Sequence, residues 1–340
     1  MSRSPLFVVL LIGIALMMVA AACAPAAAPA APISAPATAT PVPPKPTVTT
    51  EPTKPAAPAA GYPLTLKDEL GREVKIATRP GRIVSLAPSI TEVLFAVGAG
   101  PQVVGLTKYC NYPPAAAQGR EIVGGFSAKS LSVEKIISLK PDLVFAAGAT
   151  HKPVSEALEA AGVTVFNFDP KDFAGVYANI LAAGALTGNP AQAEKVVAGM
   201  KARIEKVTTA AASIPQDQRV KVFYEVWDEP LMTAGPATFI GQMIELAGGV
   251  NVFADVKEQY PTVSGEAVIA RAPAVIVGPN SHGEGLTAEK IAARPGWKDL
   301  AALKAGRIVI VDGDIISRSG PRLADALEAV ARGLYPERFK

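Results

Sequence analysis

The feature that most constrains the fold of this chain is an internal repeat. The segment LSVEKIISLKPDLVFAAG (131–148) has a counterpart in VSGEAVIARAPAVIVGP (263–279). In each copy a glutamate, Glu134 or Glu266, stands seven residues before a proline, and an apolar run follows the proline. Each copy therefore predicts a short helix that ends near the proline and leads into a buried strand. Further segments repeat in the same order, namely 95–105 with 245–253 and 162–169 with 306–314.

A long helical pattern, NPAQAEKVVAGMKARIEKVTTAAA (189–212), lies between the two copies. Asn189 and Pro190 predict its N-cap and its first helical position. Its apolar residues recur at steps of three and four, as one buried helical face requires; they are Ala193, Val196, Val197, Met200, Ile204 and Val207. The repeat and this helix together predict two α/β lobes joined by one long helix, with a ligand-binding cleft between the lobes.

The N-terminal residues predict export. An apolar run, residues 6–22, follows Arg3 and is too short for a comfortable membrane span. Small residues before Cys23 resemble a bacterial lipobox, although Ala20 stands where leucine is usual. We expect residues 1–22 to be a lipoprotein signal peptide and Cys23 to carry the lipid that anchors the protein to a membrane. The alternatives are cleavage after Ala22, which leaves a soluble protein, and an uncleaved anchor.

Composition then divides the rest of the chain. Residues 23–61 are rich in Ala, Pro and Thr and cannot bury a core, so we expect a disordered tether. We expect an N-terminal lobe at 62–188, a bridging helix at 189–213 and a C-terminal lobe at 214–340. The formal net charge of +3 without a basic run argues against a nucleic-acid partner.

The chain lacks the residue patterns of common active sites. Its two histidines, His151 and His282, lie far apart on polar segments, and no metal-ligand spacing occurs. No H-E-x-x-H, G-x-S-x-G or phosphate-loop motif is present. Without Cys23, only Cys110 remains, which excludes an intramolecular disulfide and suggests a small buried or loop residue. These patterns favour a binding protein over an enzyme, with no catalytic residues, no metal site and no permanently bound cofactor.

Several residues near predicted helix starts allow more than one interpretation. Ser89 and Glu92 have the spacing of a capping box. Tyr109 and Tyr112 lie on a proline-rich loop, where aromatic rings either fill the core or form the wall of an apolar pocket.

Arg318 and Arg322 flank a helix start, where cations oppose the helix dipole. Either both arginines are exposed or one reaches into the cleft towards an anionic group. Phe126 follows two glycines, Gly124 and Gly125, which leave its loop free to shape itself.

Long segments also resemble a known family. RIVSLAPSITEVLFAVGAGPQVVGLTKYCNYPP, VFYEVWDEPLMTAG and YPTVSGEAVIARAPAVIV are similar to segments of the substrate-binding proteins of ABC importers for vitamin B12 and ferric siderophores. The resemblance covers nearly all of 62–336. It implies an α/β fold of two Rossmann-like lobes with parallel central sheets, bridged by one long rigid α-helix. It also implies a monomeric cell-envelope protein that delivers its ligand to the permease of an ABC importer.

The resemblance carries roles for particular residues. It implies that Glu134 and Glu266 dock on permease arginines. It places Tyr109 or Tyr112, Phe126, Trp227 and Tyr260 in the wall of the ligand cleft, with Arg318 and Arg322 as candidates for an anionic chelate. Cobalamin is the first ligand expected, and a ferric siderophore or haem is the alternative. Two aromatic positions differ from the tryptophans of cobalamin binders, and 315–317 lacks their aromatic residues. A secreted two-lobe enzyme is the remote alternative.

Overall fold

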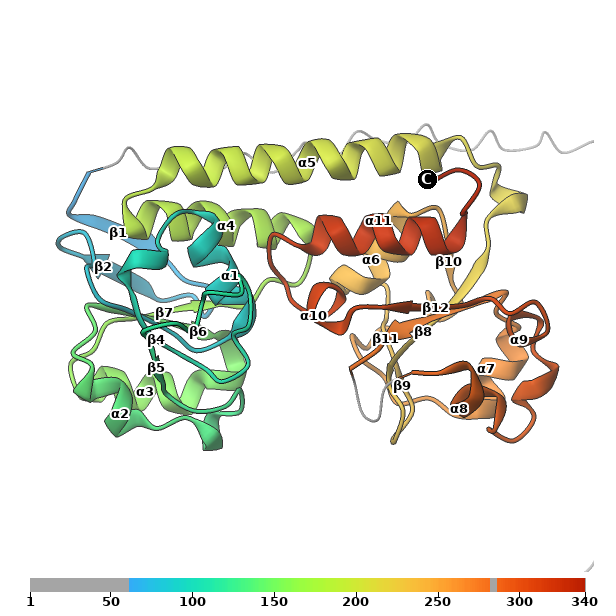
Figure 1. Ribbon diagram of the computed structural model, residues 1–340, viewed down its shortest axis with the longest axis horizontal. Coiled ribbons are helices and arrows are strands. Elements are labelled where there is room, and N and C mark those ends of the chain that lie inside the picture. Colours follow the sequence, from blue (N-terminus) through green and yellow to red (C-terminus); the bar gives the residue numbers. More distant parts are fainter. Residues whose placement is uncertain (1–60, 282–285, 340) are drawn as a thin grey trace, which may run out of the picture. The chain divides into compact units, whose positions relative to one another are not determined.

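Two parallel β-sheets form the framework of the protein (Figure 1). The computed structural model describes residues 61–281 and 286–339. The strands of the first sheet are parallel throughout and precede the long helix in the chain. In spatial order they are β5 (Glu121–Ile122), β4 (Val103–Leu106), β3 (Ile83–Ser85), β6 (Leu143–Ala147) and β7 (Val165–Phe168). A separate antiparallel hairpin comes before them, formed by β1 (Leu64–Lys67) and β2 (Glu73–Ile76).

The second sheet follows the long helix in the chain. Its parallel strands are, in spatial order, β10 (Val250–Asn251), β8 (Lys221–Trp227), β11 (Val275–Pro279) and β12 (Ile308–Val311). The short β9 (Met232–Thr233) pairs antiparallel with β8. Both β6 and β11 are buried along most of their length, as expected for strands covered on both faces. The repeated segments of the sequence therefore supply central strands to two separate sheets.

Helices cover both sheets (Figure 1). Before the long helix come α1 (Pro88–Ala96), α2 (Val133–Ser138), α3 (Lys152–Ala160) and α4 (Phe173–Thr187). After it come α6 (Phe239–Leu246), α7 (Gly265–Arg271), α8 (Ala288–Ala292), α9 (Ala301–Lys304), α10 (Gly313–Ile316) and α11 (Leu323–Leu334). Single 3-10 turns are η1 (Gly100–Gln102), η2 (Ala128–Ser130), η3 (Gly148–His151), η4 (Gln216–Gln218) and η5 (Trp297–Asp299).

The long helix α5 (Pro190–Ala212) connects the two halves. Figure 1 shows it running along α4 and α11, and it packs against both. Its buried face contains the predicted apolar positions except Val196, which is only partly buried, and it also includes Ala211. Asn189 stands at the N-cap as predicted, but its side chain makes no capping hydrogen bond. One buried cluster continues from the first sheet through α4, α5 and α11 into the second sheet.

The structure confirms the predicted fold class, α/β with parallel sheets and a long connecting helix. The predicted capping box is wrong, because α1 begins at Pro88 after the N-cap Ala87, and Glu92 is buried in its interior. Among the described residues, no helix combines the length and hydropathy needed to cross a membrane. The signal peptide, Cys23, nearly all of the tether 23–61, and His282 lie outside the described residues. The lobe boundaries at 62–188, 189–213 and 214–340 stay predictions.

Candidate ligand-binding cleft

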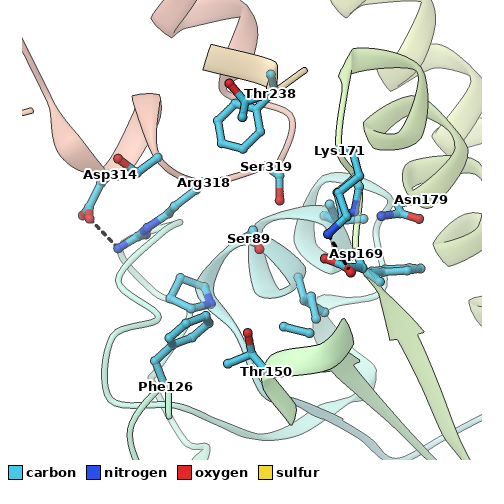
Figure 2. Close-up of a pocket in the computed structure, with 18 of the residues that line it drawn as sticks. Ser89, Phe126, Thr150, Asp169, Lys171, Asn179, Thr238, Asp314, Arg318 and Ser319 are labelled. Atoms are coloured by element: carbon cyan, nitrogen blue, oxygen red, sulfur yellow. Dashed lines mark hydrogen bonds and ion pairs between the residues drawn. The ribbon is translucent and has the colours of Figure 1, made fainter. Parts of the chain in front are cut away.

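A cleft of about 570 Å³ opens between the half of the protein before α5 and the half after it (Figure 2). This volume lies within the roughly 300–1,000 Å³ of typical ligand pockets. The first half contributes residues of 88–179, and the second half contributes residues of 238–319. In Figure 2, Phe126 and Thr150 lie on one side, with Thr238 and Ser319 across from them.

Sheet topology explains where the cleft lies. In the first sheet the chain adds β4 and β5 on one side of β3 and then adds β6 and β7 on its other side. The order of the strands therefore reverses at the neighbouring strands β3 and β6. The last residue of β6, Ala147, lines the cleft, and the segments that follow β3 and β6 supply Pro88 and Thr150. Ligands bind at such switch points, at the carboxyl ends of parallel strands. In the second sheet, Ser281 after β11 and Gly313 after β12 reach the cleft in the same way.

Three predicted aromatic residues line this cleft. Tyr109, Phe126 and Tyr260 are 49%, 44% and 39% exposed, so the interpretation of Tyr109 as a core residue is wrong. Their rings offer apolar surface that a bound ligand can cover. Partial burial raises the pKa of Tyr260 to about 12, so its phenol stays protonated at neutral pH.

Two other predicted aromatic residues lie outside the cleft lining. Tyr112 is exposed, and the Arg322 guanidinium lies over its ring at 4.2 Å from the ring centroid. Trp227 ends β8, and its indole Nε1 donates to the Glu229 carbonyl at 2.9 Å. It borders a separate and much smaller hollow beside Arg294. The structure therefore brings together Tyr109, Phe126 and Tyr260 but not Tyr112 or Trp227.

The two predicted arginines form a buried network with Glu92. The Glu92 side chain is only 2% exposed, and the side chains of Arg318 and Arg322 are 13% and 15% exposed. Arg322 donates to both carboxylate oxygens at 2.8 and 2.6 Å, and Arg318 donates to Oε1 at 2.9 Å. Because Glu92 belongs to α1 and the arginines follow α10, these bonds join the two halves. The interpretation of both arginines as exposed residues is therefore wrong, and the carboxylate holds the pKa of Arg322 above its usual value.

Arg318 is the one of this pair that lines the cleft. It also donates to Asp314 Oδ1 at 2.5 Å, Asn111 Oδ1 at 2.7 Å and the Tyr109 carbonyl at 3.2 Å. The other charged lining residues pair with each other, Lys171 with Asp169 at 2.8 Å. Each charged side chain that lines the cleft within the described ranges thus has an opposite charge beside it.

His151 and Cys110 are both buried. His151 is fully buried rather than part of a polar surface loop, and burial lowers its pKa. Its Nδ1 accepts from the Ala147 amide at 3.0 Å. Cys110 is a free buried thiol, as predicted, and it accepts a hydrogen bond from the Thr91 hydroxyl at 3.1 Å. No group of three or more His, Cys, Asp or Glu side chains suited to a metal ion occurs in the part of the chain that the structure describes.

Glu134 and Glu266 occupy equivalent positions. Each is exposed in the first turn of a short helix, two residues after a serine N-cap, Ser132 for α2 and Ser264 for α7. Hydrogen bonds from its own backbone amide and from Ser264 lower the pKa of Glu266. In Figure 1, α2 and α7 both lie on the side of the sheets away from α5.

Sequence reasoning missed the polar residues of the cleft. Hydroxyl and amide groups line it beside the aromatic rings, and they belong to Ser89, Thr150, Asn179, Thr238, Gln259, Ser281, Ser317 and Ser319. Asp169 and Lys171 were missed as well. One signal was available, because Asp169 directly follows β7 and so stands at the carboxyl edge of a parallel sheet.

Comparisons with known proteins agree with this architecture. Residues 83–315 match the periplasmic binding protein family. The ABC transporter substrate-binding lipoprotein YvrC of Bacillus subtilis (strain 168) is 34% identical over 284 residues, which cover 82% of this chain and 88% of YvrC. A cobalamin-binding protein of Halobacterium salinarum is 32% identical over 282 residues, covering 82% of this chain and 75% of that protein.

Two solved structures are also similar. The periplasmic vitamin B12 binding protein of Vibrio cholerae has a TM-score of 0.63 at 31% identity, covering 75% of this chain and 96% of that one. The apo form of a periplasmic haem-binding protein from Roseiflexus sp. RS-1 has a TM-score of 0.68 at 30% identity, covering 75% and 98%. The chain therefore belongs to the periplasmic binding protein family, a family of extracytoplasmic solute-binding proteins that serve transport.

Proposed function

We propose that this protein captures a corrinoid, with cobalamin as the first candidate, in the cleft and delivers it to the permease of an ABC importer. The observation that carries the proposal is the chemistry of the cleft wall. Aromatic rings, among them the exposed Tyr109, Phe126 and Tyr260, stand beside many hydroxyl and amide groups, and the charged lining residues are paired within the protein. A corrinoid has a broad macrocycle and peripheral amide groups, which such a wall can contact through stacking and hydrogen bonds.

The paired charges also favour a corrinoid over an anionic ferric siderophore as the ligand. A ferric catecholate carries several negative charges and needs cations that are free to meet it. Arg318 already donates to Glu92, Asp314 and Asn111, so binding an anion through this residue would compete with buried ion pairs. A multiply charged ferric siderophore is therefore the weaker candidate.

Haem binding is a second candidate function. It is supported by the similarity to the Roseiflexus haem-binding protein and by two phenols in the cleft, Tyr109 and Tyr260. Tyrosine can ligate haem iron when its phenol loses its proton. The pKa of about 12 at Tyr260 opposes that step. Tyr109 is the more exposed of the two phenols and is the better placed candidate for such a ligand.

Permease docking through Glu134 and Glu266 belongs to the same proposal. Their equivalent places in the two halves would present two carboxylates on one side of the protein. Exposed ion pairs contribute only about 0–1 kcal/mol each, so these glutamates would orient the encounter more than add affinity.

Lipid attachment at Cys23 is also part of the proposed function, because it would keep the protein at the membrane. It would hold the binding domain beside the permease through the Ala/Pro/Thr-rich tether. With Cys23 intact we expect the protein in the membrane fraction, and Cys23→Ala should shift it to the soluble fraction. An unchanged distribution would contradict the lipid anchor.

Calorimetric titration tests the ligand. The full-length protein is titrated with cyanocobalamin, haemin, a ferric hydroxamate and a ferric catecholate. We expect saturable binding of cyanocobalamin, weakened about tenfold by Tyr260→Ala, because that substitution removes ring area worth about 1–2 kcal/mol. Trp227→Ala is the matched control, because Trp227 lies outside the cleft lining, and its effect should stay within about twofold. Saturation by haemin alone would favour the second candidate, and no saturation by any probe would overturn the proposal.

A further inference from the structure

The cleft aromatic Phe126 lies at the end of a narrow loop. The loop leaves the first sheet after β5 and returns at Leu131, which forms an isolated bridge with Gly124. A Cβ atom on Gly124 would lie 2.1 Å from the Ser130 carbonyl oxygen, so the two arms of the loop touch. Gly124 adopts φ 138°, a conformation that glycine allows and that this close approach uses. Phe126 is nevertheless 44% exposed, so its surroundings cover only part of its surface.

A buried histidine contacts Phe126 from behind. His151 ends η3, and none of its surface is exposed. Its ring meets the Phe126 ring edge-on, with centroids 5.3 Å apart and an interplanar angle of 61°. Its Nε2 lies 2.6 Å from the Phe126 carbonyl oxygen. Thr150, next to His151 in the chain, lies beside Phe126 in the cleft (Figure 2).

The two hydrogen bonds of His151 determine its protonation. The Ala147 amide can only donate, so Nδ1 must be the unprotonated acceptor of that 3.0 Å bond. The proton of the neutral ring is then on Nε2, which donates it to the Phe126 carbonyl. A second proton on Nδ1 would point at the N–H of Ala147, so two donors would face each other and this hydrogen bond would be lost. The neutral imidazole is therefore the form that joins Phe126 to the end of β6.

We propose that His151 is a positioning residue for the ligand, which holds Phe126 against the cleft through its neutral Nε2–H tautomer. The proposal rests on the proposed function in so far as Phe126 contacts the chelate. It predicts that ligand affinity depends on the hydrogen bond to the Phe126 carbonyl and on the charge of this one ring.

Burial and one backbone hydrogen bond, rather than a neighbouring charge, determine the direction of the pKa shift of His151. The charged side chains on the packed elements are Lys129 on η2, Lys152, Glu156 and Glu159 on α3, and Asp169 after β7. Lys152 pairs with Glu156 at 3.9 Å, Glu159 with Arg72 at 2.5 Å, and Asp169 with Lys171 at 2.8 Å. Burial lowers the pKa of His151, and the Phe126 carbonyl raises it by a smaller amount. Protonation therefore occurs below the ordinary histidine value of roughly 6.5.

Two substitutions separate the two ring nitrogens. His151→Asn places an acceptor near the Nδ1 position but cannot reach the Phe126 carbonyl, whereas His151→Gln places an amide N–H near the Nε2 position. Both are made in a His282→Gln background, which leaves His151 as the one histidine of the chain. At pH 8 we expect His151→Asn to weaken cyanocobalamin binding about three- to tenfold, as the loss of one hydrogen bond implies. His151→Gln should stay within about twofold of the parent.

The pH profile distinguishes positioning from a purely structural role. Between pH 8 and 4.5 the parent should lose affinity with a midpoint below about 6.5, because a proton on Nδ1 opposes the Ala147 amide and pushes the ring, and Phe126 with it, away from the end of β6. His151→Gln should show no such step, because an amide does not titrate in this range. Identical profiles for the parent and His151→Gln, or full affinity of His151→Asn at pH 8, would overturn the proposal.

A second readout works without any ligand. Phe126→Trp introduces an indole at the loop tip, and its emission is followed against pH in the same background, with the chain lacking that substitution as the blank. We expect a step whose midpoint matches the His151 pKa measured from imidazole ¹⁵N shifts, and no step after His151→Gln. The step without chelate binding would leave the positioning role standing while the proposed function fails. No step would overturn the positioning role even if cobalamin binds.

Discussion

Single residues in this protein act through partners that are remote in the chain. Glu92 stands 226 residues from Arg318 and 230 residues from Arg322, yet it bonds to both. A buried carboxylate is tolerable only when opposite charges and hydrogen-bond donors surround it. The three side chains therefore form one structural unit, and they join the two halves beside the ligand cleft.

Removing the charge of Glu92 tests this unit. We expect Glu92→Gln to lower the free energy of unfolding by on the order of 3 kcal/mol, because two largely buried guanidinium groups lose their carboxylate. Glu205→Gln on the exposed face of α5 is the matched control and should cost at most about 0.5 kcal/mol. Urea unfolding measures both variants. Equal stability of the two variants would show that the buried ion pairs do not hold the halves together.

At the scale of elements, α4 and α5 approach each other closely through small residues. A Cβ atom on Gly184 of α4 would lie 2.4 Å from the Ala193 Cβ of α5 and 3.1 Å from the Asn189 carbonyl oxygen. Gly188, at φ 77°, ends α4 in the left-handed conformation that glycine adopts readily. The connection between the first half and the long helix thus depends on glycine at two positions, one for space and one for backbone conformation.

Two glycine-to-alanine substitutions separate helix propensity from packing. Gly199 lies exposed in the middle of α5 with no atom near its missing Cβ, so Gly199→Ala should stabilise the protein by up to about 1 kcal/mol. Gly184→Ala should destabilise it by about 1–3 kcal/mol, because the new methyl group collides with Ala193. Thermal unfolding measures the stability change of both variants. If both substitutions stabilise or both destabilise the protein, the proposed close contact between α4 and α5 is contradicted.

On the scale of the whole molecule, transport requires that binding and docking use different surfaces. The cleft lies at the carboxyl ends of the strands, whereas Glu134 and Glu266 start α2 and α7. Neither glutamate lines the cleft. The double substitution Glu134→Ala and Glu266→Ala should therefore leave cyanocobalamin affinity within about twofold of the parent.

Transport by cells is the measurement that distinguishes docking from mere surface charge. We expect uptake to fall more than about tenfold in the double variant, because two orienting ion pairs of up to about 1 kcal/mol each are lost together. Glu194→Ala with Glu205→Ala on α5 removes the same charge elsewhere and should leave uptake unchanged. Normal uptake by the Glu134→Ala, Glu266→Ala variant would show that neither glutamate is needed for docking.

Local patterns in the sequence determined the two halves and the long helix. Periodicity of apolar residues and prolines after helices act over a few residues, so α5 and the repeated strands could be predicted. Tyr109, Phe126 and Tyr260 came from the family resemblance, and the cleft includes them.

Only the tertiary structure decided which side chains meet. A sequence shows that Glu92, Arg318 and His151 exist, but contacts over more than 200 residues, or between a loop and a strand end, depend on how elements pack. Local rules assigned Glu92 to a capping box and His151 to a polar surface. The fold buried both, because burial is decided by the surrounding layers and the cost of burial is offset by hydrogen bonds from distant partners.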